Sequence, residues 1–118
     1  MEFVVFLGND KENWGQITAL LNHLDCDKFI LVKDKSTLGF PTNLKCKVIN
    51  INSSSPLLEL REEMHNALRK ELSKEFEVSI SLASGSGKEH MALISALLTI
   101  PVGIKLIAYT KKGVEYLS

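Results

Sequence analysis

A short run of glycine, serine and lysine, Ser84-Gly85-Ser86-Gly87-Lys88, is the stretch of the sequence best suited to binding an anion. Glycines let a backbone approach a ligand closely, and the unpaired N–H groups at the start of a helix favour negative charge. The serines add hydroxyl donors, and the lysine adds a positive charge. This run therefore predicts a binding site for a phosphate or a carboxylate. The alternative is a plain strand-to-helix turn, in which glycine and serine serve geometry alone.

This run differs from two common nucleotide-binding motifs. A Walker A loop needs Gly where Leu82 stands and Ser or Thr where Glu89 stands. A dinucleotide fingerprint would follow the first strand, where the sequence has one glycine, Gly8. The predicted anion site is thus of another kind. His90, which follows in the first helical turn, is expected to face solvent rather than the ligand.

A second polar segment follows the first predicted strand and contains Gly8, Asn9, Asn13 and Trp14. Amide side chains can hydrogen-bond a base or a ribose, and tryptophan can stack on a base. Trp14 lies on the apolar stripe of the following helix, which favours a place in the core. Asn9 could instead cap that helix in a capping box with Glu12. Gly8, Asn9 and Asn13 therefore remain candidate ligand-binding residues.

Alternating apolar runs and helical periodicity predict the elements that must position these two segments. Strands are expected at 3–7, 29–32, 48–51, 76–82, 105–108 and 114–117, and helices at about 9–24, 56–72 and 87–99. Such alternation is typical of a mostly parallel sheet with helices on both faces. Right-handed crossovers favour the strand order 3-2-1-4-5, with strand 6 antiparallel at the edge. We therefore predict one Rossmann-like α/β domain over residues 1–118.

This strand order makes strands 1 and 4 neighbours at the centre of the sheet. Their helices are expected on opposite faces, which opens a crevice at the carboxyl ends of the strands, where open α/β sheets bind ligands. The segment at 8–13 and the loop at 84–88 both follow these strands. The topology thus favours a binding site over a plain turn.

Composition limits the partners of the chain. Its 118 residues are 45% hydrophobic and 24% charged, which is typical of one globular domain. The 14 Lys and Arg residues balance the 14 Asp and Glu residues, so a basic coat for DNA or RNA is excluded. No apolar run reaches the ~18 residues of a membrane span, and the first residues do not resemble a signal peptide. A cytoplasmic protein with no direct DNA binding is expected.

Neither a metal nor another cofactor is expected. A structural zinc site needs three or four clustered ligands. The histidines at 23, 65 and 90 and the cysteines at 26 and 46 show no such spacing.

The third predicted helix carries apolar residues nearly all round, from Met91 to Ile100. A helix on a sheet needs only one apolar stripe, so a second apolar face needs a second partner. We expect a homodimer through Met91–Leu98, with two copies of the 84–88 loop near one axis. On this hypothesis, a charge at Leu93 or Leu97 splits the dimer. Burial inside the monomer, under the segment at 33–46, is the alternative.

With these features together, the chain resembles the CRISPR-associated Rossmann-fold (CARF) domain family. Members often carry a Ser or Thr after strand 4 and a Lys or Arg four residues later, which Ser84 and Lys88 match. The acidic or amide residue that often precedes this Ser or Thr by two positions is Leu82 here. The resemblance covers nearly the whole chain.

This resemblance implies a dimer that binds a cyclic oligoadenylate messenger across its twofold axis, in CRISPR-linked antiviral defence. Ser84, Gly85 and Lys88 would contact the phosphates and ribose, and Gly8 and Asn9 would line the same pocket. Family members usually carry a fused output domain, and none is expected in this sequence. The resemblance therefore implies a lone sensor, a chain that acts through a separate effector protein, a fragment of a longer protein, or a ring nuclease.

Three hypotheses follow, and each can be distinguished by experiment. The first is a dimeric sensor of a cyclic oligoadenylate. The second is an enzyme, such as a metal-independent ring nuclease in which Ser84 orients a ribose hydroxyl and Lys88 stabilises the developing charge. The third is an α/β interaction protein with a structural Ser/Gly loop.

Overall fold

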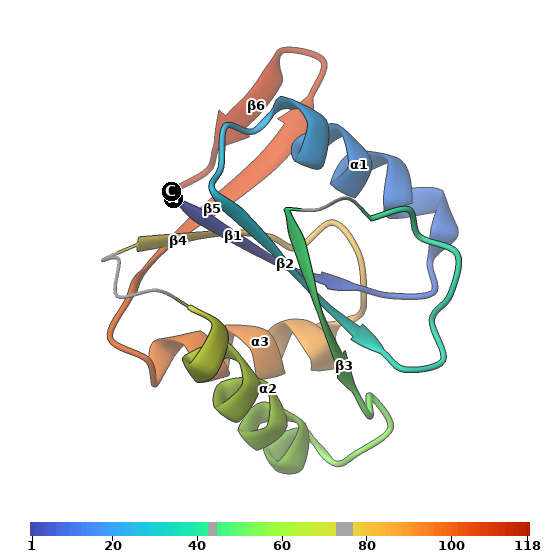
Figure 1. The fold of residues 1–118 in the computed structure, drawn as a ribbon, viewed down its shortest axis with the longest axis vertical. Coiled ribbons are helices and arrows are strands. Elements are labelled where there is room, and N and C mark those ends of the chain that lie inside the picture. Colours follow the sequence, from blue (N-terminus) through green and yellow to red (C-terminus); the bar gives the residue numbers. More distant parts are fainter. Residues whose placement is uncertain (43–44, 73–76) are drawn as a thin grey trace.

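Six strands form one sheet in the computed structural model, which describes residues 1–42, 45–72 and 77–118. The order is β3-β2-β1-β4-β5-β6, and all neighbours are parallel except β5 and β6 (Figure 1). The predicted strand order is therefore confirmed. Phe76, the predicted start of the fourth strand, lies outside the described residues. The strands are β1 (Glu2–Leu7), β2 (Lys28–Asp34), β3 (Cys46–Ile51), β4 (Glu77–Ser81), β5 (Gly103–Thr110) and β6 (Gly113–Tyr116).

Helices cover both faces of the sheet. The helix α1 (Trp14–His23) lies on one face, and α2 (Leu57–Glu71) and α3 (Gly87–Leu98) lie together on the other (Figure 1). The prediction that the helices after β1 and β4 take opposite faces is thus confirmed. No helix in the described part of the chain is long and apolar enough to cross a membrane.

The central strand β1 is fully buried because both of its faces are covered. Its side chains alternate between the two layers, as strand geometry requires. Phe3, Val5 and Leu7 pack on the α1 side, whereas Val4 and Phe6 pack against α2 and α3. The carboxyl end of β1 is therefore held by packing on both sides, and the loop after β1 begins from this fixed point.

Two local features concern the ends of elements. The turn between β5 and β6 places Gly113 at a φ of +100°, a left-handed conformation that favours glycine. The helix α2 begins at Leu57, with Pro56 as its N-cap, one residue later than predicted.

The predicted capping box of Asn9 and Glu12 is wrong. The chain forms a 3-10 turn at Lys11–Asn13, and α1 begins only at Trp14, without a side-chain cap. Asn9 is exposed. Asp10, which would have been the first residue of the helix, instead turns its side chain to the loop after β4, so the α-helix starts one turn later.

The second apolar face of α3 is covered by α2, which corrects the premise of the dimer prediction. Leu93 and Leu97 have no solvent exposure in the single chain, so neither faces outward. They pack in one cluster with Leu60, Met64 and Leu68 of α2. The alternative of burial inside the monomer is therefore correct, although α2 rather than the 33–46 segment provides the cover. The reason is topological, since the crossovers through α2 and α3 lie on the same face.

Candidate functional site

The two predicted segments meet at the carboxyl ends of β1 and β4. These strands are direct neighbours, with Val5 of β1 beside Ser81 of β4. The Gly8 N–H donates a hydrogen bond to the Ser84 hydroxyl oxygen at 2.8 Å. The first loop and the 84–88 loop therefore form one continuous polar edge, as the topology predicted.

Asp10 joins the two loops, a role that the sequence alone did not reveal. Its Oδ1 accepts from the Ser84 hydroxyl at 2.7 Å and from the Gly85 N–H at 3.2 Å. Its Oδ2 accepts from Asn13 Nδ2 at 2.8 Å. Burial raises the pKa of the Asp10 carboxyl, but the hydrogen bonds from Asn13, Ser84 and Gly85 outweigh it, so the pKa lies below its usual value. Asp10 is thus held ionised at the centre of the junction.

Gly8 and Gly85 allow the loops to touch. A Cβ at Gly8 would lie 2.6 Å from Asp10 Oδ1 and 3.0 Å from the Gly85 Cα. Gly85 has a φ of +97°, and a Cβ there would lie 2.7 Å from Cδ1 of Phe6. Both glycines therefore have a geometric role, which is compatible with a site but does not require direct contact with a ligand.

The start of α3 is the part of the edge that still has free donors. The first helical N–H groups have no intrahelical partner, and Ser86 makes no side-chain cap bond to them. Its hydroxyl instead bonds the Glu89 carboxylate. Ser86 and Gly87 are exposed, and nothing lies within 4 Å of a Cβ built at Gly87. An anion could approach these N–H groups without moving the backbone.

Lys88 is half-buried and bonds across to the loop after β3. Its Nζ donates to the Ser53 carbonyl oxygen at 3.0 Å. An ammonium group has three N–H donors, so this contact leaves donors for a ligand. Lys88 is therefore positioned at the edge of the site by a backbone contact.

Asp34, at the end of β2, holds the same β3–α2 loop, and it was missed at the sequence level. Its Oδ1 accepts from both the N–H and the hydroxyl of Ser53, each at 2.9 Å. Bonds from the Ser36 hydroxyl, from Ser53 and from the Ser36 N–H hold the pKa of Asp34 far below its usual value. The segment Asp34-Lys35-Ser36 carries a detectable signal, because Asp followed two residues later by Ser favours an Asx turn. Hydrogen bonds thus connect the ends of β2, β3 and β4 through Asp34, Ser53 and Lys88.

His90 does not simply face solvent, as was expected, but folds back on the loop. Its Nε2 lies 2.7 Å from the Ser84 carbonyl oxygen. A carbonyl only accepts, so Nε2 carries the proton and donates. The imidazole therefore braces the 84–88 loop from the helix side.

Three candidate residues of the first segment remain to be placed, namely Trp14, Asn13 and Asn9. Trp14 lies half-buried at the edge of the core rather than inside it. It packs edge-on against Phe40, and its Nε1 donates to the Gly8 carbonyl oxygen at 2.8 Å. Asn13 is engaged by Asp10. Asn9 is exposed beside the junction.

Replacing Asp10 with asparagine is expected to destabilise the chain at pH 7 by about 1.5–3 kcal/mol, because bonds to a charged acceptor are lost. The pKa of Asp10 is lowered in the folded chain, so its contribution is complete above the unfolded value. It is lost as the pH falls through the folded value. The gap between wild type and Asp10→Asn should therefore shrink below about pH 4 in urea unfolding. Asp25→Asn, at an exposed carboxyl, serves as control. An equal gap at pH 7 and pH 3 would contradict this role.

The described residues include no group of three His, Cys, Asp or Glu side chains that could hold a metal ion.

No protein-family model and no curated protein matches the sequence. Solved structures do match the fold. Protein VC1899 from Vibrio cholerae is similar with a TM-score of 0.69 and 12% identity over 98% of this chain. Csm6 from Enterococcus italicus, solved bound to cyclic hexa-2′-fluoro-hexa-dAMP, is similar with a TM-score of 0.66 and 16% identity over 90% of this chain. This chain spans 33% of the first protein and 32% of the second. At these identities the likenesses show the fold alone, and this fold agrees with the predicted Rossmann-like α/β domain.

Proposed function

We propose that this chain is a CARF-like sensor domain that binds a cyclic oligoadenylate at the carboxyl ends of β1 and β4. The observation that carries the proposal is the fold shared with Csm6, a protein solved with a cyclic adenylate analogue. The polar edge formed by the 8–13 and 84–88 segments supports it, because it lies at the crevice where open α/β sheets bind ligands. In CRISPR-linked antiviral defence, such a domain would signal through an effector protein.

The hydrogen bonds of the edge suggest which residues contact the ligand. Ser84 is fully buried, with its hydroxyl bonded to both Gly8 and Asp10, so we assign it a positioning role. The N–H groups at the start of α3 and the ammonium of Lys88 would bind a phosphate. Asn9 would reach a ribose or base from the opposite side.

The proposal includes a homodimer, because a cyclic ligand with an even number of units can itself be twofold symmetric. Such a ligand could meet two copies of the site identically, whereas a linear one could not. The outward apolar residues of α3 are Met91, 57% exposed, and Leu98, 71% exposed. They would replace Leu93 and Leu97 as the contacts between the subunits.

Titration with cyclic and linear oligoadenylates of four and six units tests the proposed ligand. We expect one cyclic molecule per dimer and much weaker binding of the linear form, measured by calorimetry and light scattering. Recovery of intact cyclic ligand after incubation supports a sensor, and its cleavage would support a ring nuclease instead. A monomer that binds one cyclic ligand per chain would overturn the shared site.

Leu98→Glu is expected to separate the subunits, because a charge buried without a partner in an apolar interface costs several kcal/mol. Leu58→Glu is the matched control, since Leu58 of α2 is 70% exposed and lies outside the proposed interface. Light scattering should report a monomer for the first variant and a dimer for the second. A dimer that survives both substitutions would show that its interface lies elsewhere.

A further inference from the structure

Asp34 lies at the carboxyl end of β2, and hydrogen bonds occupy all the acceptor positions of its carboxylate. Oδ1 accepts from the N–H and from the hydroxyl of Ser53, each at 2.9 Å. Oδ2 accepts from the N–H of Ser36 at 2.8 Å and also from the Ser36 hydroxyl. An ionised carboxylate has about four lone pairs that can accept a hydrogen bond. Because four donors already use them, Asp34 can influence a binding site only through the groups that it holds.

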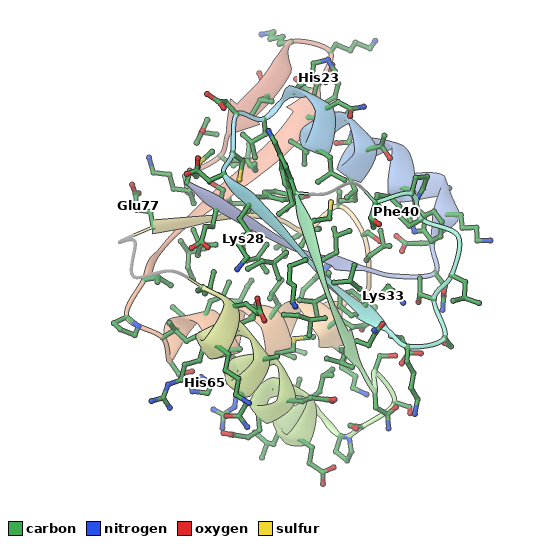
Figure 2. The ribbon with its side chains drawn as sticks, viewed as in Figure 1. His23, Lys28, Lys33, Phe40, His65 and Glu77 are labelled. Atoms are coloured by element: carbon green, nitrogen blue, oxygen red, sulfur yellow. The ribbon has the colours of Figure 1, made fainter. Side chains whose placement is uncertain are left out.

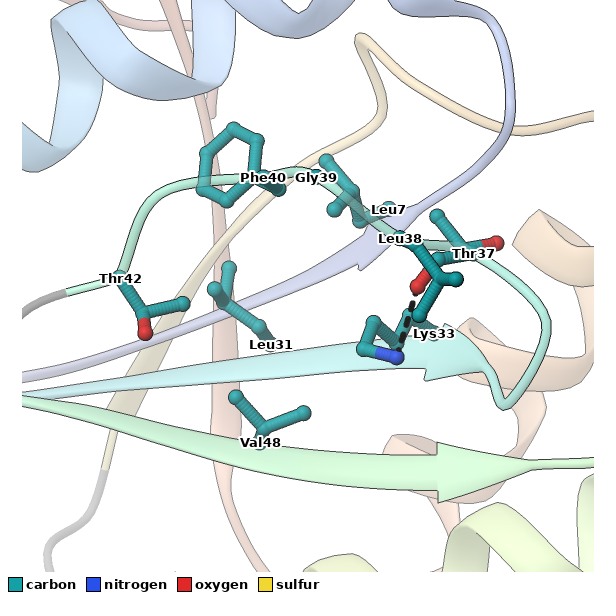
Figure 3. A pocket seen from close by; sticks show the side chains of 9 residues that line it. All are labelled: Leu7, Leu31, Lys33, Thr37, Leu38, Gly39, Phe40, Thr42 and Val48. Carbon is teal, nitrogen blue, oxygen red and sulfur yellow. Dashed lines mark hydrogen bonds between the residues drawn. The ribbon is translucent and has the colours of Figure 1, made fainter.

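The turn after β2, which carries Asp34, is itself bonded at several points. The Thr37 N–H donates to the Asp34 carbonyl oxygen at 3.0 Å, and the Lys35 N–H donates to the Ile51 carbonyl oxygen of β3 at 3.1 Å. Lys33 lies where β2 ends (Figure 2), and its Nζ donates to the Thr37 carbonyl oxygen at 2.8 Å (Figure 3). The Asp34 carboxylate therefore has a fixed place relative to the sheet.

Ser53 links this turn to the proposed phosphate site. Its N–H and its hydroxyl bond the Asp34 carboxylate, and its carbonyl oxygen accepts from Lys88 Nζ at 3.0 Å. Ser53 belongs to the loop between β3 and α2, whereas Lys88 belongs to the first turn of α3, after β4. A carboxylate at the end of β2 thus reaches the ammonium of Lys88 through a single intervening residue.

The bond to Ser53 holds Lys88 without neutralising its charge. Among the described residues, Lys88 forms no ion pair with a carboxylate. The Ser53 carbonyl oxygen uses one of the three N–H donors of the ammonium, so two donors remain for a ligand. A long side chain that is free in solution loses conformational entropy when a ligand immobilises it, and a side chain already held in place loses less. The contact with Ser53 therefore preorganises Lys88 for a phosphate.

We propose that Asp34 is a positioning residue for the anion site: it holds Ser53, and the Ser53 carbonyl oxygen in turn holds the Lys88 ammonium at the start of α3. The inference rests on the proposed function for the identity of the ligand, a cyclic oligoadenylate. It adds that the affinity of the site depends on a carboxylate that does not touch the ligand. The end of β2 and the β3–α2 loop thereby become part of the binding machinery.

A double-mutant cycle tests whether Asp34 acts through Lys88. Asp34→Asn is expected to weaken binding of cyclic tetra- or hexa-adenylate about five- to tenfold, because the ligand must then immobilise a free lysine side chain. In a chain that already carries Lys88→Ala, the same substitution should leave the affinity nearly unchanged. Calorimetry on the four folded chains of the cycle measures this difference. An equal loss of affinity in both backgrounds would overturn the inference, because a general structural role does not require Lys88.

Asp25→Asn is the matched control for charge. It removes the same negative charge from an exposed carboxyl that precedes β2, at the other end of the strand from Asp34. The affinity for the cyclic ligand should stay at the wild-type value. A change equal to that in Asp34→Asn would assign the effect to long-range electrostatics and overturn the positioning role.

A pair of serine variants provides the same test with smaller changes, and it decides the question if Asp34→Asn fails to fold. Ser53→Ala and Ser36→Ala each remove one hydroxyl that donates to the Asp34 carboxylate. Only Ser53 carries the carbonyl oxygen that holds Lys88. We therefore expect Ser53→Ala to weaken binding about threefold and Ser36→Ala to weaken it less. Equal affinities for the two variants would overturn the inference.

NMR of the lysine side chains separates the inference from the proposed function. If the wild type binds no cyclic oligoadenylate, the proposed function fails, and the mobility of Lys88 then decides the inference. In a chain with isotope-labelled lysine, the ε-methylene group of Lys88 should have a higher order parameter than that of Lys111, which is exposed in the turn between β5 and β6. Lys88→Arg assigns the signal. Asp34→Asn should lower the Lys88 order parameter to the Lys111 value, and an unchanged order parameter would overturn the inference.

Discussion

Leu93→Glu is expected to unfold the chain rather than to split a dimer. Leu93 has no solvent exposure and lies among the apolar side chains of α2, α3 and the sheet. A carboxylate there would be desolvated without a partner, at a cost of more than about 4 kcal/mol, which is a large part of the stability of a small domain. Circular dichroism and urea unfolding should show a chain with little or no folded population at 25 °C.

The matched control for this prediction is Leu98→Glu on the same helix. Leu98 is 71% exposed, and a surface substitution changes folding by about 0.5 kcal/mol or less. The two variants therefore separate folding from association, because only Leu98→Glu is expected to stay folded. A folded Leu93→Glu variant of reduced mass would show that α2 does not cover this face in solution.

Lys88→Ala is expected to weaken binding of the cyclic oligoadenylate about 10- to 100-fold, because a hydrogen bond to a charged group contributes about 1.5–3 kcal/mol. Its effect on folding should be smaller, since the loss is one bond from a half-buried, water-accessible ammonium to the Ser53 carbonyl oxygen. Calorimetric titration and urea unfolding measure the two effects on one sample. A large loss of affinity together with a small loss of stability would identify Lys88 as a residue that contacts the ligand.

Lys111→Ala provides the matched control, because it removes the same charge from the exposed turn between β5 and β6. It lowers the net charge equally, so it reports any long-range electrostatic effect. Affinity unchanged in Lys88→Ala, or reduced equally in both variants, would contradict a phosphate contact at the start of α3.

At the polar edge, the sequence predicted where the two segments lie but not which groups their side chains bind. The glycines, serines and lysine of the 84–88 run predicted an anion site. The predicted strand order placed this run beside the loop after β1, where the structure has it. The partners of each side chain were not predictable. Asp10 lies 74 residues from Ser84, and no local pattern shows that its carboxylate would take the serine hydroxyl. His90 and Lys88 likewise bond backbone carbonyls, which every residue carries.

The sequence by itself determined the sheet and its order. Buried parallel strands appear as continuous apolar runs, helices appear as stripes, and right-handed crossovers leave few ways to connect them. The tertiary structure alone decided how the apolar faces are shared. Periodicity shows that α3 has two apolar faces, but only the packing shows that α2 covers Leu93 and Leu97 and leaves Leu98 outside. The physical reason is that hydrophobic burial is not directional, so a sequence pattern specifies that a face must be covered and not which element covers it.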